Sequence, residues 1–105
     1  MKIAILVDNT CYQLGQEIIK ILEKKDIWYM YAWARNSDDT SSNNKVVEYT
    51  TMDVLDEKIL GIIITDTGIW ANVEANKVDW IRATLCNNFN QARWGREEHN
   101  VNIIC

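Results

Sequence analysis

Short apolar segments alternate with amphipathic segments along most of this chain. Nearly continuous apolar runs predict buried strands at 2–7, 28–34, 61–65, 81–86 and 101–105. Between them, apolar residues at helical spacing predict helices at 12–25, 46–55, 69–77 and 88–99. This alternation predicts parallel β-α-β units, so we expect one α/β domain over 1–105, a three-layer α/β/α sandwich around a five-stranded parallel, Rossmann-like sheet.

The predicted sheet indicates where a ligand would bind. In open parallel sheets the site lies beyond the carboxyl ends of the strands, which here selects residues 8–11, 65–70 and 87–88. The polar stretch "NSDDTSSNN" at 36–44 has no hydrophobic anchor and is predicted to be a loop.

Composition narrows the class of protein. Hydrophobic residues make up 48% and charged residues 25%, which is typical of a globular domain. The net charge is −4 and the basic residues are scattered, so we expect no nucleic-acid binding. The three cysteines and one histidine have no metal-ligand spacing, which predicts no metal site and reduced thiols of a cytoplasmic protein. No apolar run approaches the roughly 20 residues that span a bilayer, so no membrane partner is expected.

Four segments together resemble a known family: "KIAILVDN", "GIIITDTGIWANVEANK", "IRATLC" and "ARWGREEHNVNII". In this order they are similar to the ribose-5-phosphate isomerase B and galactose-6-phosphate isomerase family over almost the whole chain. The resemblance implies interconversion of aldose and ketose phosphates through an enediolate, without a cofactor. It also implies a site between subunits, and therefore a homodimer or higher oligomer, or a mixed assembly with a related subunit.

The resemblance assigns candidate site residues one by one. Asp8 matches the aspartate after the first strand, and Asn9 stands where the family has histidine. Thr67 and Gly68 match the turn after the third strand, and both are expected to hold the sugar, with Thr67 taking part in catalysis. His99 and Asn100 match the family's histidine and asparagine if the alignment slips by one residue. Without that slip Glu98 occupies the histidine position, and the sequence leaves this choice open.

Other positions depart from the family pattern. Thr65 stands where most members have the cysteine base, and Ala71 stands where another branch has a glutamate. Trp70 replaces a glycine and is expected to fill part of the sugar pocket. The family's phosphate-binding arginines belong to a C-terminal segment beyond the match. The resemblance therefore implies little isomerase activity from this chain alone.

Asp66 is the candidate for a replacement base, because burial can raise the pKa of a carboxylate toward neutrality. The competing interpretation is a helix N-cap, in which the carboxylate accepts backbone N–H groups. Cys11 is a second candidate base, although an ordinary thiol is the simpler interpretation. His99 lies near a predicted helix end, where the helix dipole also favours a cation. The alternative function is a noncatalytic domain that keeps the fold and uses its surface for assembly.

Overall fold

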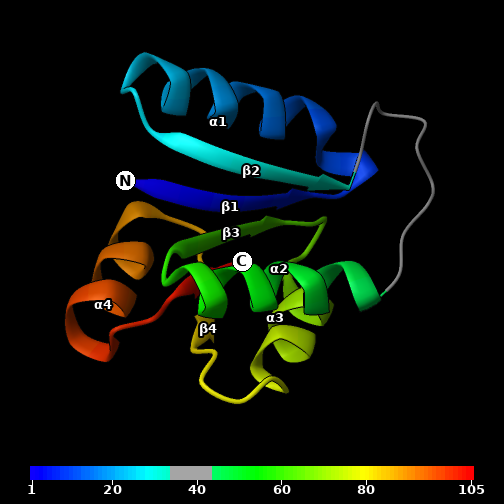
Figure 1. Cartoon of the computed structure of the whole chain (residues 1–105), viewed down its shortest axis with the longest axis vertical. Helices are drawn as coiled ribbons and strands as arrows, with labels where there is room; N and C mark the ends of the chain where they lie inside the picture. The colour runs from blue at the N-terminus through cyan, green and yellow to red at the C-terminus, as the bar shows by residue number, and fades with distance from the viewer. Residues whose placement is uncertain (34–43) are drawn as a thin grey trace.

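The computed structural model describes residues 1–33 and 44–105. Five parallel strands form one sheet in the order β2-β1-β3-β5-β4, and all of them point the same way (Figure 1). The strands are β1 (Lys2–Val7), β2 (Trp28–Trp33), β3 (Leu60–Ile64), β4 (Ala83–Thr84) and β5 (Ile103–Ile104). The predicted parallel α/β fold is confirmed.

The helices follow the strands in strict alternation. A short 3-10 turn, η1 (Asn9–Cys11), leads from β1 into the first helix. The α-helices are α1 (Tyr12–Lys24), α2 (Asn44–Glu57), α3 (Ile69–Asn76) and α4 (Phe89–His99). α2 is longer than the sequence predicts, although it contains β-branched residues. Two of them, Thr50 and Thr51, are buried and donate their hydroxyl groups to the helix's own carbonyls of Val46 and Glu48.

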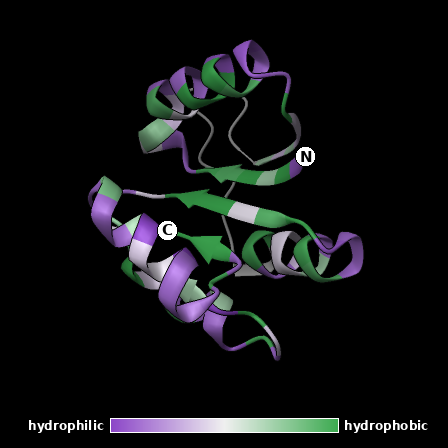
Figure 2. Ribbon diagram, turned by 90° about the vertical axis from the view of Figure 1, so that its left-hand side faces the viewer, coloured by the Kyte–Doolittle hydropathy of each residue, from purple (hydrophilic) through white to green (hydrophobic). Residues whose placement is uncertain are grey.

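The sheet has a different hydrophobic core on each face. On one face, Ala4, Leu6, Ile63 and Ile103 pack with residues of α2 and α3. On the other face, Ile5, Val7 and Ile64 pack with Ile19 of α1. Figure 2 shows the visible strands as mostly hydrophobic, whereas the helices carry both colours. This is the pattern of a parallel sheet covered on both sides by amphipathic helices.

The predicted element ends are wrong at the last two strands. The sequence predicts strands at 81–86 and 101–105, but β4 and β5 have only two residues each. Side chains compete for the backbone here, because the N–H of Arg82 donates to Asn102 Oδ1 and the N–H of Ala83 to Asn76 Oδ1. Ala34 and most of the predicted polar loop lie outside the described residues; Asn44, the last loop position, begins α2.

None of the helices in the described ranges is long and apolar enough to cross a membrane.

Candidate functional site

The turn after β3 is the central feature of the carboxyl edge of the sheet. Three successive backbone N–H groups in this turn each donate to a side-chain oxygen of the turn itself. Thr67 N donates to Asp66 Oδ1 at 2.8 Å, Gly68 N to Thr65 Oγ1 at 3.0 Å, and Ile69 N to Thr67 Oγ1 at 3.3 Å. The backbone N–H groups of such a turn can bind an anion, but here the chain's own side chains already accept their hydrogen bonds.

Gly68 is the residue that makes this turn possible. Its φ is +76°, in the left-handed region that residues with a Cβ rarely adopt. A Cβ at this position would also lie 2.5 Å from Leu85 Cδ1. Gly68 is the N-cap of α3, so the predicted capping position of Asp66 is wrong by two residues. Asp66 still accepts a backbone N–H, that of Thr67, but this residue precedes α3 and is not part of the helix.

A cavity of about 340 Å³ lies beside this turn. The side chains of α1 form one wall, the carboxyl halves of β3 and β5 form the floor, and the turn forms the rim. Its lining residues are Leu14, Ile18, Ile62, Ile63, Ile64, Thr65, Asp66, Thr67, Gly68, Cys86, Asn87, Ile104 and Cys105. The only charged side chain among them is the carboxylate of Asp66, so no side chain in this wall attracts a phosphate.

The residues after β1 lie next to the same turn. The backbone N–H of Asp8 donates to the carbonyl of Ile64 at 2.8 Å, which joins the carboxyl ends of β1 and β3. The Asp8 carboxylate accepts the N–H of Thr10 at 3.0 Å and caps η1, which also contains Asn9. The structure thus brings Asp8 and Asn9 to the same edge as Asp66, as the sequence predicts for this fold.

His99 and Asn100 lie at the opposite, amino edge of the sheet. α4 starts at the carboxyl edge after β4, and it ends at His99, just before β5 begins. Asn100 has a φ of +51° and ends the helix in a left-handed conformation. Its carbonyl accepts Arg82 Nε at 2.7 Å and its Oδ1 accepts Arg96 Nη1 at 2.8 Å. One copy of the chain therefore does not place these two residues beside Asp66.

The three thiols differ in their surroundings. Burial raises the pKa of Cys105 from 9.0 to about 12, and the neighbouring Cys86 adds to the shift. Burial also raises the pKa of the Cys86 thiol. Cys11 packs against the core on the α1 face of the sheet. The two cysteines that line the cavity are therefore protonated at neutral pH and do not act as bases there.

Trp70 does not fill the cavity. It packs against the core on the α2 and α3 face of the sheet, beside buried Ala71 and Ala75. The expected obstruction of the pocket is therefore wrong, because the left-handed turn at Gly68 directs the next residues of α3 over the opposite face.

Sequence reasoning missed the structural role of Thr65. The family pattern places Thr65 at the position of the cysteine base, yet Thr65 is buried and its hydroxyl accepts the amide N–H of Gly68. The spacing Thr-x-x-Gly is the available signal, since threonine hydroxyls often accept a backbone N–H in tight turns. Asn87, in the predicted segment 87–88, does line the cavity. Cys105 has no such signal, because only the sheet order places β5 beside β3.

The cavity offers hydrogen-bonding oxygens and a carboxylate, but no described basic side chain. Among the described residues there is no group of three or more potential ligands that could hold a metal ion. These hydrogen-bonding groups suit the hydroxyl groups of a small polar molecule better than an anionic group.

Three comparisons with known proteins agree on the kind of protein that this chain is similar to. Residues 3–105 match the family described as Ribose/Galactose Isomerase. A putative sugar phosphate isomerase of Rickettsia conorii, RC0402, is 34% identical over 109 residues, covering 97% of this chain and 71% of that protein.

The solved structures match over nearly the whole chain. Ribose-5-phosphate isomerase B of Clostridium thermocellum has a TM-score of 0.90 at 30% identity, covering 99% of this chain and 70% of that one. Ribose-5-phosphate isomerase B of Mycoplasma genitalium, solved with bound ribulose-5-phosphate, has a TM-score of 0.89 at 25% identity, with the same coverage.

Proposed function

Because this chain belongs to the ribose/galactose isomerase family, we propose that it takes part in the aldose–ketose isomerisation of a phosphorylated sugar. The observation that carries the proposal is the cavity beside the left-handed turn at Thr67-Gly68. It lies beyond the carboxyl end of a central parallel strand, where ligands of such sheets bind. A structural neighbour, the Mycoplasma genitalium enzyme, was solved with ribulose-5-phosphate.

In this proposal the chain holds the sugar and leaves proton transfer to a second subunit. The hydroxyl of Thr67 and the carboxylates of Asp8 and Asp66 face sugar hydroxyls. An enediolate mechanism needs a base within hydrogen-bond reach of the reacting carbon. Thr65 cannot be that base, because its hydroxyl is a very weak acid and already holds the amide of Gly68.

A second subunit would bring His99 and Asn100 to the site. In one copy these residues lie at the amino edge of the sheet, so they reach a carboxyl-edge cavity only from another chain. The proposed assembly is a homodimer or a mixed assembly with a related subunit that carries the base and the phosphate-binding cations.

The binding step can be tested by calorimetric titration with ribose 5-phosphate. Asp66→Asn removes a negative charge from the rim. A phosphate nearby then binds roughly fivefold more tightly, since the repulsion between two unit charges about 4 Å apart is worth about 1 kcal/mol in water. Asp53→Asn on α2 is the matched control and leaves binding unchanged. Binding that does not respond to Asp66→Asn would place the sugar elsewhere.

An apolar groove supports the alternative role in assembly. Ile62 and Ile104 of the sheet are only half-buried between α1 and α4, where a cavity of about 200 Å³ is lined almost entirely by apolar groups. Leu14 and Ile21 of α1 are more than half exposed. Parallel sheets are normally covered on both faces, so this surface fits a second copy of the chain. A clean monomer in sedimentation at micromolar concentration would contradict both roles.

A further inference from the structure

A second cavity lies at the amino edge of the sheet, away from the turn at Gly68. Its volume is about 400 Å³, within the range of small-molecule sites. The last turn of α2 and the start of β3 form one side, and the segments before β4 and β5 form the other. The lining residues are Val54, Leu55, Lys58, Ile59, Leu60, Trp80, Arg82, Arg96, Asn100 and Asn102.

The charge of this cavity is strongly positive. Lys58, Arg82 and Arg96 line it, and no carboxylate does. None of the four ion pairs among the described residues involves one of these three basic side chains. The C-terminal ends of α2 and α4 face this edge, and together they contribute roughly one negative charge. Within the part of the chain that the structure describes, about two positive charges of this cavity are therefore left without a counter-charge.

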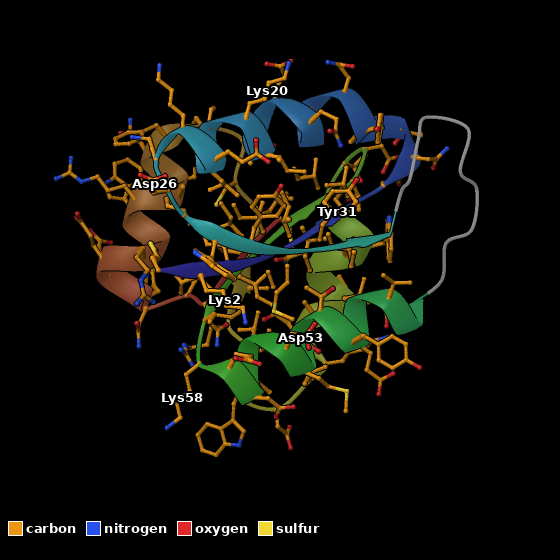
Figure 3. The ribbon with its side chains drawn as sticks, turned by 45° about the horizontal axis from the view of Figure 1, so that its top comes forward. Lys2, Lys20, Asp26, Tyr31, Asp53 and Lys58 are labelled. Atoms are coloured by element: carbon orange, nitrogen blue, oxygen red, sulfur yellow. The ribbon has the colours of Figure 1, made fainter. Side chains whose placement is uncertain are left out.

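The two arginines are held in place by backbone oxygens. Arg82 donates from Nε to the carbonyl of Asn100 at 2.7 Å and from Nη1 to the carbonyl of Trp80 at 3.1 Å. Arg96 donates from Nη1 to the carbonyl of Val101 at 2.9 Å. Among the described residues, the remaining guanidinium N–H groups have no carboxylate partner. Lys58 extends outward from the end of α2 (Figure 3), where its flexible stem can swing toward a bound anion.

Backbone strain is concentrated around the same cavity. Four non-glycine residues of the described chain have a positive φ, and three of them line this cavity: Lys58 at +53°, Trp80 at +72° and Asn100 at +51°. A left-handed conformation costs about 1–2 kcal/mol for a residue with a Cβ. Such residues cluster at ligand sites, where the strain serves the geometry of binding. Trp80 is 80% exposed, so its ring offers a flat apolar surface beside the cations.

From this combination we propose that the amino-edge cavity binds a small organic phosphate. The phosphate contacts Arg82, Arg96 and Lys58, and an apolar or aromatic face of the ligand stacks on Trp80. Arginine forks suit phosphate oxygens in particular, and an exposed tryptophan is the best surface for stacking. In one copy of the chain this cavity is separate from the carboxyl-edge cavity. It shares Asn100 with the residues that the proposed assembly brings to a partner's site, but none of its three cations belongs to that set.

Two probes and two strain-relieving variants test this site by calorimetry at low ionic strength. Inorganic phosphate reports the cations alone, whereas adenosine 5′-monophosphate adds a flat ring. Lys58→Gly and Trp80→Gly each remove one proposed contact at a left-handed position, so both are expected to fold at least as well as the parent. Lys24→Gln on α1 is the control that makes the same charge change elsewhere.

We expect the nucleotide to bind roughly tenfold more tightly than inorganic phosphate, because stacking on one aromatic ring gives about this gain. Trp80→Gly abolishes that gain without changing inorganic phosphate binding. Lys58→Gly weakens both probes several-fold, and Lys24→Gln changes neither. Absence of binding, binding unaffected by Lys58→Gly and Trp80→Gly, or binding lost in Thr67→Ala instead would overturn the proposal. Ribose 5-phosphate binding that responds to Asp66→Asn remains a separate result, so the two proposals fail independently.

Discussion

The two edges of the sheet have opposite chemistry. At the carboxyl edge, the cavity beside the Gly68 turn carries one negative charge, and the turn's own side chains satisfy its amides. At the amino edge, the second cavity carries three positive charges and no carboxylate. One backbone has thus kept the geometry of a ligand site at one edge, while the groups that attract an anion lie at the other.

This difference shows that the backbone geometry of a ligand-binding turn does not by itself make an anion site. The left-handed Gly68 and the parallel sheet are enough to build the cavity. An anion site needs, in addition, free N–H groups or cations, and here Thr65, Asp66 and Thr67 occupy the N–H groups. Binding of a phosphate at the carboxyl edge would therefore need cations that do not line this cavity.

The largest expected effect comes from breaking the carboxyl-edge turn itself. Gly68→Val forces a branched side chain into a left-handed conformation and against Leu85. We expect a loss of unfolding free energy of about 3 kcal/mol or more, from strain and overpacking together. Urea denaturation followed by circular dichroism measures it. A loss below about 1 kcal/mol would mean that the turn rearranges easily.

A smaller loss is expected when the turn keeps its shape but loses one hydrogen bond. Thr65→Val replaces the buried hydroxyl by a methyl group and leaves the N–H of Gly68 without an acceptor. The expected cost is about 1–3 kcal/mol. Thr67→Ala is the matched control: its hydroxyl is exposed, so water replaces it at little cost. Equal losses in the two variants would contradict a special role for Thr65.

The smallest effect concerns pH. Because burial raises the pKa of Cys105 from 9.0 to about 12, the folded state keeps this thiol protonated more strongly than the unfolded state does. Its contribution to stability is complete below about pH 9 and is lost as the pH rises toward 12. Between about pH 9 and pH 12, the unfolding temperature should fall less steeply with rising pH in Cys105→Ala than in the parent. An identical slope would show that the thiol is solvated.

The alternating pattern of apolar segments was enough to predict the sheet, its direction and the edge that carries the turn. It could not set the ends of β4 and β5, because Asn76 and Asn102 take over backbone groups there through contacts distant in sequence. The direction of Trp70 likewise depends on the path of α3 after Gly68.

The amino-edge cavity had no signal in the sequence. Lys58, Arg82 and Arg96 are far apart along the chain. Arg82 and Arg96 stand in two of the segments that carry the family resemblance, but those segments do not show that the two side chains meet. Only the sheet order brings the starts of β3, β4 and β5 together. The positions of His99 and Asn100 also depend on the order of the elements. Both stand at the end of α4, just before β5, and this places them at the amino edge of the sheet.

We propose that this chain has the fold and the cavity of a sugar-phosphate isomerase but no base of its own. A coupled isomerase assay tests this most directly. Purified protein would be given ribose 5-phosphate beside the variants Asp66→Asn and Thr65→Cys. Loss of general acid–base catalysis removes about 10²–10⁴-fold of rate, so we predict only trace turnover from all three proteins. Robust turnover by the parent that disappears in Asp66→Asn would contradict the account and make Asp66 the base.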